Sequence, residues 1–265
     1  MTGHQTFDEL VAEAAAQPVE GWDFSWLAGR ATEERPAWGY SGLLRERLAG
    51  AEAVLDIQTG GGEVLAGALR GSDHRPAAVA ATESWPPNAM LAHRALAPWR
   101  GAVVRAADAG WLPFRMDSFD LVVSRHPVAV VWPEIARVLA PGGTYLSQQI
   151  GPGTNRELTD FMMGPQPVNK SRDPRRAETA ARAAGLEVTE LREQAMRVEF
   201  FDVGAVVYFL RKVLWTVPGF TVAGYARQLA RMHEHITEHG SFISHAQRFL
   251  ITARAPGDPA RSGYR

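Results

Sequence analysis

The sequence lacks cysteine altogether and has only two lysines, Lys170 and Lys212, among its 265 residues. The absence of cysteine excludes disulfides, thiolate metal sites and a cysteine nucleophile. The formal net charge is only −1, so no overall field draws the protein to nucleic acid or to an anionic membrane. The N-terminal stretch shows no basic segment followed by an apolar core, and no apolar run is long enough to cross a bilayer. We therefore expect a cytoplasmic protein without membrane contact.

Short apolar runs alternate with helical patterns along most of the chain, which is typical of a parallel sheet. Seven runs are predicted strands: 53–57, 76–82, 102–107, 119–125, 144–150, 186–194 and 248–255. The alternation predicts an α/β fold. We expect a Rossmann-like, doubly wound, mostly parallel seven-stranded sheet with helices on both faces and a helical lid.

No internal repeat is visible in the sequence. Shifts in composition predict boundaries between segments of the chain. Residues 1–50 are rich in aromatic side chains and are predicted to form an N-terminal helical cap. Residues 51–255 are predicted to form the main domain, with lid inserts at about 151–173 and 200–243. Residues 256–265 are predicted to be a flexible tail.

The stretch AVLDIQTGGGEVL, Ala53–Leu65, places three glycines between two acids at a strand-to-helix turn. Gly60, Gly61 and Gly62 have no Cβ, so a ligand can approach their backbone closely. A dinucleotide needs a helix N-terminus free of negative charge, but here Asp56 and Glu63 flank the turn and no Lys or Arg occurs between them. The spacing also departs from G-x-G-x-x-G. The turn therefore disfavours a dinucleotide oxidoreductase and suits a cation.

Two further acids follow the next predicted strands. Glu83 comes roughly 20 residues after the glycine turn, where an acid meets ribose hydroxyls in nucleotide-binding folds, and Asp108 follows the third strand. A nucleoside that carries a positive charge and no phosphate would account for all these acids. S-adenosylmethionine is such a molecule.

Several sequence blocks appear in the order of a known family: AVLDIQTGGGE, Glu83, DAGWLPFRMDSFDLVVSR and ARVLAPGGTYL. Over roughly Glu52–Ile150 the chain resembles the class I S-adenosylmethionine-dependent methyltransferases, in particular the type 11 group that is similar to quinone-biosynthesis enzymes. The resemblance implies methyl transfer to a small molecule, with S-adenosylhomocysteine as the product of the cofactor. The N-P-P-Y signature of enzymes that methylate nucleobases or glutamine amides is absent.

The resemblance also implies which residues bind the cofactor: Asp56, Gln58, Thr59, Gly60, Gly62, Glu83, Ser84, Asp108, Ala109, Ser124 and Arg125. Glu83 would bind the ribose, Asp108 the adenine amino group, and Ala109 would offer a backbone contact. Gln58 departs from the family, which usually has its first glycine at this position. Arg125 would bind a substrate carboxylate or pair with an acid of the cofactor site.

His126 is the candidate catalytic residue, because the resemblance places it opposite the transferable methyl group. A histidine titrates near neutral pH and can accept a proton from a hydroxyl or amine. The alternative is that it only caps the strand. The aromatics that precede the first strand are candidate substrate or sulfonium contacts: Trp22, Trp26, Trp38 and Tyr40. Packing against the domain is the alternative for each of them.

We expect no metal. His235 and His239 share a helix face, but the H-E-x-x-H pattern is absent, and the basic run Lys170–Arg176 is interpreted as a solvated loop. A small-molecule substrate is the expected partner, and the oligomeric state is left open. A non-catalytic S-adenosylmethionine-binding protein and an RNA-directed methyltransferase stay open as alternatives. The sequence does not identify the acceptor, nor does it distinguish O-, N- and C-methylation.

Overall fold

A computed structural model describes residues 5–19 and 23–257 of the protein. Its contacts divide the chain into two compact units. The sheet unit comprises Pro36–Gly151, Ser171–Gln194 and the chain from Arg248 onward, and the helical unit comprises Met1–Arg35, Pro152–Lys170 and Ala195–Gln247. These boundaries differ from the predicted ones, since residues 36–50 belong to the sheet unit and the helical unit is assembled from three separate segments.

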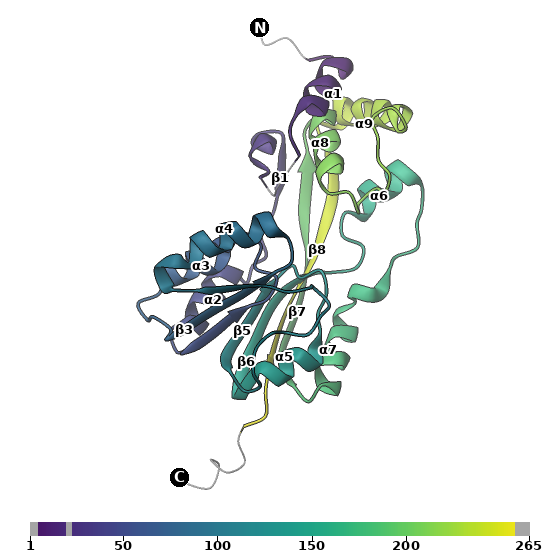
Figure 1. Ribbon diagram of the computed structural model, residues 1–265. Coiled ribbons are helices and arrows are strands. Elements are labelled where there is room, and N and C mark those ends of the chain that lie inside the picture. Colours follow the sequence, from purple (N-terminus) through teal and green to yellow (C-terminus); the bar gives the residue numbers. More distant parts are fainter. Residues whose placement is uncertain (1–4, 20–22, 258–265) are drawn as a thin grey trace. The chain divides into compact units, whose positions relative to one another are not determined.

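The sheet unit follows the alternation of strands and helices that the sequence predicts (Figure 1). Its helices are α2 (Tyr40–Leu48), α3 (Glu63–Arg70), α4 (Pro86–Leu96), α5 (Trp132–Val138) and α7 (Pro174–Ala183). The strands between them are β2 (Ala53–Asp56), β3 (Ala78–Glu83), β4 (Ala102–Arg105), β5 (Phe119–Arg125) and β6 (Leu139–Ile150). Strand β7 (Glu187–Phe200) begins in the sheet unit and ends in the helical unit. Strand β8 (Phe242–Arg254) begins in the helical unit and ends in the sheet unit.

Hydrogen bonds connect the strands in the order β1-β7-β8-β6-β5-β2-β3-β4. The pairs β2–β3, β2–β5, β3–β4 and β5–β6 are parallel, and β8 runs antiparallel to β6. From β2 the chain adds β3 and β4 on one side and then β5 and β6 on the other, so the strand order reverses between β2 and β5. Ligands of such sheets bind beyond the carboxyl ends of the strands at this reversal. The loops that follow β2, β3 and β5 are therefore the place to look for a site.

Both faces of the sheet are covered by helices, as the near-continuous apolar strands require. One apolar cluster packs α2, α3 and α4 on one face, with Leu44, Leu65 and Leu96 fully buried (Figure 1). The other packs α5 and α7 on the opposite face, with Ile135 and Ala181 buried. The predicted Rossmann-like α/β fold is confirmed.

The helical unit contains α1 (Phe7–Ala16), α6 (Arg156–Met163), α8 (Val203–Lys212) and α9 (Ala226–His239), with the short strand β1 (Ala31–Glu33) paired to the end of β7. Capping residues mark where two of these helices begin. Thr6 and Glu9 form a capping box at the start of α1, and Asp202 accepts a hydrogen bond from the Ala205 backbone at the start of α8.

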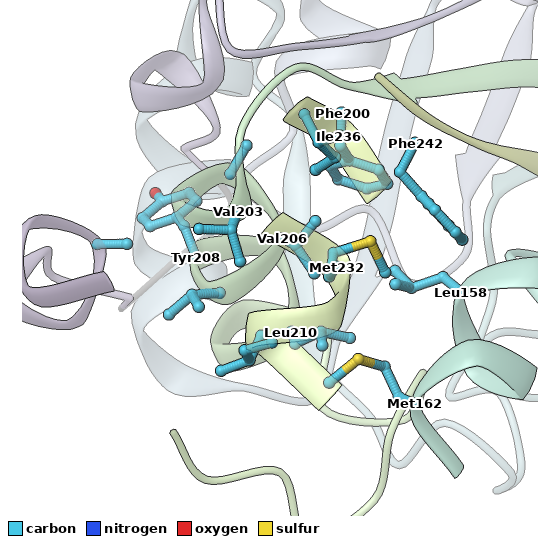
Figure 2. Packing of buried hydrophobic residues seen from close by; sticks show 14 of the residues in the cluster. Leu158, Met162, Phe200, Val203, Val206, Tyr208, Leu210, Met232, Ile236 and Phe242 are labelled. Carbon is cyan, nitrogen blue, oxygen red and sulfur yellow. The ribbon is translucent and has the colours of Figure 1, made fainter. Parts of the chain in front are cut away.

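Figure 2 shows the apolar core of this unit, where Leu158, Phe200, Val206 and Met232 point toward one another and are fully buried. The predicted inserts thus contribute to a core of their own, whereas their function as a lid stays a prediction.

The structure differs from the prediction in four larger details. The strand β1 was not foreseen, and β6 begins five residues before the predicted 144. Strand β7 continues six residues past the predicted 194, and β8 begins six residues before the predicted 248. Residues 258–265 of the predicted tail lie outside the described residues. Within the described part of the chain, no helix combines the length and the apolar character that crossing a membrane demands.

Candidate functional site

The glycine turn between β2 and α3 lies at the carboxyl edge of the sheet. Gly60 and Gly62 adopt positive φ angles of 63° and 78°, a region that glycine enters without steric cost. A Cβ on Gly62 would lie 3.0 Å from the Ala92 Cα atom of α4. Gly62 therefore permits close packing of α3 on α4, whereas a Cβ on Gly60 would meet nothing within 4 Å. Among the described residues, none therefore obstructs the approach of a ligand to Gly60.

Glu83 at the end of β3 is tied to this turn. Its Oε2 atom accepts a hydrogen bond from the Gly60 backbone at 2.9 Å, and its Oε1 atom accepts one from the Trp85 backbone at 2.9 Å. The carboxylate is buried, with 7% of the residue exposed. Each carboxylate oxygen can accept a second hydrogen bond, so Glu83 can hold the turn and still receive two hydroxyl donors.

Asp56 ends β2 beneath the same turn and accepts a hydrogen bond from the Thr59 hydroxyl at 2.6 Å. Burial raises the pKa of Asp56 to about 7; the Thr59 hydroxyl opposes the rise and the nearby Glu83 carboxylate adds to it. Among the described residues, Asp56 forms no ion pair. A buried carboxyl next to another acid is stabilised in its charged form by a cation, so this position favours a positively charged ligand.

Gln58 joins the three loops at this edge. Its φ angle of 58° is left-handed, and its amide makes three hydrogen bonds. Nε2 donates to the Asp108 carbonyl at 3.0 Å and to the Ala129 carbonyl at 2.7 Å, and Oε1 accepts from the Val128 backbone at 2.6 Å. The crevice between these loops is reduced to about 10 Å³, roughly the room for one water. The Gln58 side chain therefore clamps the loops after β4 and β5 together.

The remaining predicted cofactor residues lie at the same edge. Ser84 and Asp108 are half-buried, and Ala109 is exposed. Ser124 is fully buried, and its hydroxyl shares hydrogen bonds with Tyr145 Oη at 2.7 Å and Ser147 Oγ at 2.9 Å. The structure thus brings these positions together, but Ser124 is already engaged by protein groups. Their cofactor contacts stay predictions.

A chain of side chains fixes His126 after the end of β5. Trp38 Nε1 donates to Gln148 Oε1 at 2.8 Å, and Gln148 Nε2 lies 2.9 Å from His126 Nε2. Indole nitrogen is only a donor, so it fixes the orientation of the Gln148 amide, which must donate to the histidine. His126 Nε2 therefore accepts, and the proton of the neutral ring is on Nδ1.

The charges around His126 oppose its protonation. Burial lowers the pKa of His126 to about 3, with further lowering from the positive charges of Arg125, Arg248 and Arg172. A histidine with this pKa carries no charge at neutral pH, and its Nε2 lone pair is already used. The surroundings favour a neutral, positioned His126, and its role as a general base stays a prediction.

The four predicted aromatic contacts fall into different places. Trp38 is buried in the hydrogen-bonded chain, and buried Tyr40 donates to the Ser124 carbonyl at 3.1 Å. Trp26 belongs to the helical unit, where its ring lies 4.9 Å from Tyr208 and beneath the Arg30 guanidinium at 4.0 Å. Trp22 lies outside the described residues. The structure gives Trp38 and Tyr40 packing and hydrogen-bonding roles, and substrate contact by any of the four stays a prediction.

No group of three or more potential metal ligands gathers within residues 5–19 and 23–257. The rings of His235 and His239 stack on each other at 4.3 Å between centroids. At the basic run, Asp173 caps α7 by accepting a hydrogen bond from the Arg175 backbone.

Sequence reasoning missed Gln148, Arg172 and Arg248. The signal for Gln148 was available, since SQQI places two amides at the end of an apolar strand. The two arginines, whose positive charges lower the pKa of His126, had no such signal, because their positions depend on the pairing of β8 and on the turn before α7.

A comparison with known families matches residues 55–147 to the sequence model described as "Methyltransferase domain". The matched segment contains the glycine turn, Glu83, Asp108 and His126. No curated protein matches the sequence at a significant level.

Solved structures show the same fold at low identity. BH2331 of Bacillus halodurans C-125, a proposed methyltransferase, is 19% identical with a TM-score of 0.54 over 82% of this chain and 98% of its own. YcgJ of Bacillus subtilis is 16% identical with a TM-score of 0.57 over 83% and 99%. A proposed methyltransferase in a complex with the Haloferax volcanii Trm112 activator is 20% identical, with a TM-score of 0.52 over 94% and 98%.

Proposed function

We propose that the chain is an S-adenosylmethionine-dependent methyltransferase of the type 11 group, whose sequence model matches residues 55–147, and that it methylates an oxygen or nitrogen nucleophile of a small molecule. The observation that carries the proposal is the acidic edge formed by Asp56 and Glu83 beneath an open glycine turn. Such an edge suits a nucleoside with a positive charge and repels phosphate.

The residues present fit this cofactor. Glu83 has acceptor capacity left for two ribose hydroxyls, and the space above Gly60 allows a ligand to lie against the backbone. The ionised Asp56 carboxylate would be stabilised by the positive charge of the bound methionine group. S-adenosylmethionine supplies a methyl group on a sulfonium, which is transferred by in-line displacement.

The chain's own contribution to transfer is alignment. The hydrogen-bonded series Trp38, Gln148 and His126 fixes the imidazole with its Nδ1–H available as a donor. A fixed donor can orient the acceptor relative to the methyl group, and orientation contributes much of the rate in bimolecular transfers. A neutral His126 that accepts no proton fits acceptors that react as a free base or lose their proton after transfer.

Isothermal titration with S-adenosylhomocysteine tests the cofactor site, with Glu83→Ala as the disrupting variant and Glu46→Gln on the exposed surface of α2 as the control. We expect binding to the wild type and to the control, and a weaker affinity in Glu83→Ala. No binding to the wild type would refute the proposal.

Incubation of cell extract with a labelled methyl donor and the purified chain tests transfer itself. A labelled small molecule identified by mass would support the proposal. Label in RNA would favour the RNA-directed alternative, and cofactor binding without any labelled product would favour a non-catalytic binding protein. The cytoplasmic location stays a prediction from the sequence.

A further inference from the structure

The amino-terminal end of strand β3 borders an open groove on the sheet unit. Its volume is about 560 Å³, within the range of roughly 300–1,000 Å³ that is usual for small-molecule sites. We propose that this groove binds a nucleoside phosphate, with the phosphate on two arginines and the base against a tryptophan. The lining residues are Arg75, Pro76, Ala77, Ala78, Val79, Trp99, Arg100 and Ala102.

The stagger of two neighbouring strands produces the groove. Edge strand β4 begins at Ala102, which pairs with Ala80, so Ala78 and Val79 of β3 extend beyond the start of β4. The groove is therefore lined by two segments, the entry to β3 and the entry to β4. Both segments belong to the sheet unit, and the inference does not depend on the proposed function.

Both arginines of the groove can donate to a ligand. The Arg75 guanidinium donates to the Pro98 carbonyl, and since a guanidinium has five N–H donors, this bond leaves others for a ligand. Arg100 is exposed and forms no side-chain hydrogen bond among the described residues. Neither arginine forms an ion pair within the described part of the chain, not even Arg75 with nearby Asp73.

The sequence around the groove has a local excess of positive charge. Between Glu83 and Asp108 it contains no acid but three arginines, Arg94, Arg100 and Arg105. All three are exposed and form no ion pair in the part of the chain that the structure describes. Because the whole chain has a net charge of only −1, this segment is distinctly basic, and it favours an anion in the groove that it borders.

The backbone of Arg100 also indicates a role for its side chain. Its φ angle of 54° is left-handed, a conformation in which glycine or asparagine meets less steric cost. No contact of the described residues uses the Arg100 guanidinium. A ligand anion in the groove would account for an arginine at this position.

The chemistry of the lining defines the class of ligand. Guanidinium groups bind phosphate oxygens through paired hydrogen bonds. Trp99 is half-buried and lines the same groove, and an indole face can stack on a nucleic-acid base. A molecule with both a phosphate and a flat aromatic ring uses the whole lining, whereas a free phosphate would use only the arginines.

The groove is separate from the centre of methyl transfer. Strand β3 runs from Ala78 in the groove to Glu83 at the acidic edge, which corresponds to roughly 17 Å along the strand. A nucleotide in the groove would therefore affect the cofactor site only through the protein, and not by contact with the cofactor.

Calorimetric titration of the full chain with guanosine monophosphate tests the groove. S-adenosylhomocysteine is present in excess, so that the cofactor site is not a second place for the nucleoside. We expect saturable binding that is tighter than that of guanosine or of inorganic phosphate. Arg75→Gln and Arg100→Gln should each weaken it by about tenfold, because each removes a charged donor.

The matched control is Arg94→Gln, which changes an exposed arginine of the same acid-free segment that does not line the groove. It should leave the affinity for guanosine monophosphate unchanged. Trp99→Leu should weaken the binding of guanosine monophosphate but not that of inorganic phosphate, and thermal unfolding shows whether each variant is folded.

Four results would overturn the inference. They are no saturable binding at millimolar guanosine monophosphate, equal weakening in Arg94→Gln, inorganic phosphate that binds as tightly as the nucleotide, and an RNA oligonucleotide that binds where the mononucleotide does not. A lack of binding by S-adenosylhomocysteine would refute only the proposed function, since the titration and the arginine variants report on the groove without it.

Discussion

The Gln58 clamp gives the sharpest prediction for stability. Each of its three hydrogen bonds contributes about 0.5–1.5 kcal/mol, so the side chain contributes roughly 3 kcal/mol. Its left-handed backbone costs a non-glycine residue about 1–2 kcal/mol. Gln58→Gly removes both terms, and we expect the free energy of unfolding to fall by about 1–2 kcal/mol.

Gln58→Glu isolates the hydrogen bonds, because it keeps the backbone conformation and the length of the side chain. It replaces two donated hydrogen bonds by contacts between a carboxylate oxygen and the Asp108 and Ala129 carbonyls. We expect a loss of about 3 kcal/mol, larger than that of Gln58→Gly. Urea unfolding followed by tryptophan fluorescence measures both variants.

Arg100→Gly is the matched control for the backbone term. Arg100 has a similar φ angle of 54°, is exposed and has no side-chain hydrogen bond among the described residues. Its replacement should leave stability unchanged or raise it by up to about 1 kcal/mol. If Gln58→Gly behaved like Arg100→Gly, the clamp would contribute nothing and the reasoning would fail.

Three further predictions concern the charged groups. Glu83→Ala should weaken S-adenosylhomocysteine binding by about 1–3 kcal/mol in calorimetry, since a charged acceptor is lost; unchanged affinity would refute its ribose role. Because the pKa of Asp56 is raised to about 7, the folded state retains a proton that the unfolded state has lost, so this group's contribution to stability is present below about pH 4 and is lost as the pH rises to 7. Asp56→Asn should abolish that part of the pH dependence, up to about 4 kcal/mol, in urea unfolding at several pH values. The ring nitrogens of His126 should show no titration between pH 5 and 8 by NMR, since its pKa is lowered to about 3, whereas Gln148→Glu should raise that pKa by placing a carboxylate beside Nε2; a wild-type midpoint near 6.5 would contradict the neutral assignment.

The sequence alone determined the fold class and the acidic half of the site. Alternating apolar runs dictate a parallel sheet, and parallel strands place their carboxyl ends at one edge. Asp56 and Glu83 end their strands, and the glycines and Asp108 follow a strand within a few residues. Their gathering at that edge could therefore be predicted from local position.

The tertiary structure decided the other half, because it depends on contacts between residues far apart in the chain. Trp38 and Gln148 are 110 positions apart, and their hydrogen bond fixes the tautomer of His126. Arg248 reaches the site only because β8 inserts antiparallel beside β6 with a particular register. Burial and neighbouring charge, which no local pattern encodes, convert a residue that titrates near neutral pH by itself into an uncharged group.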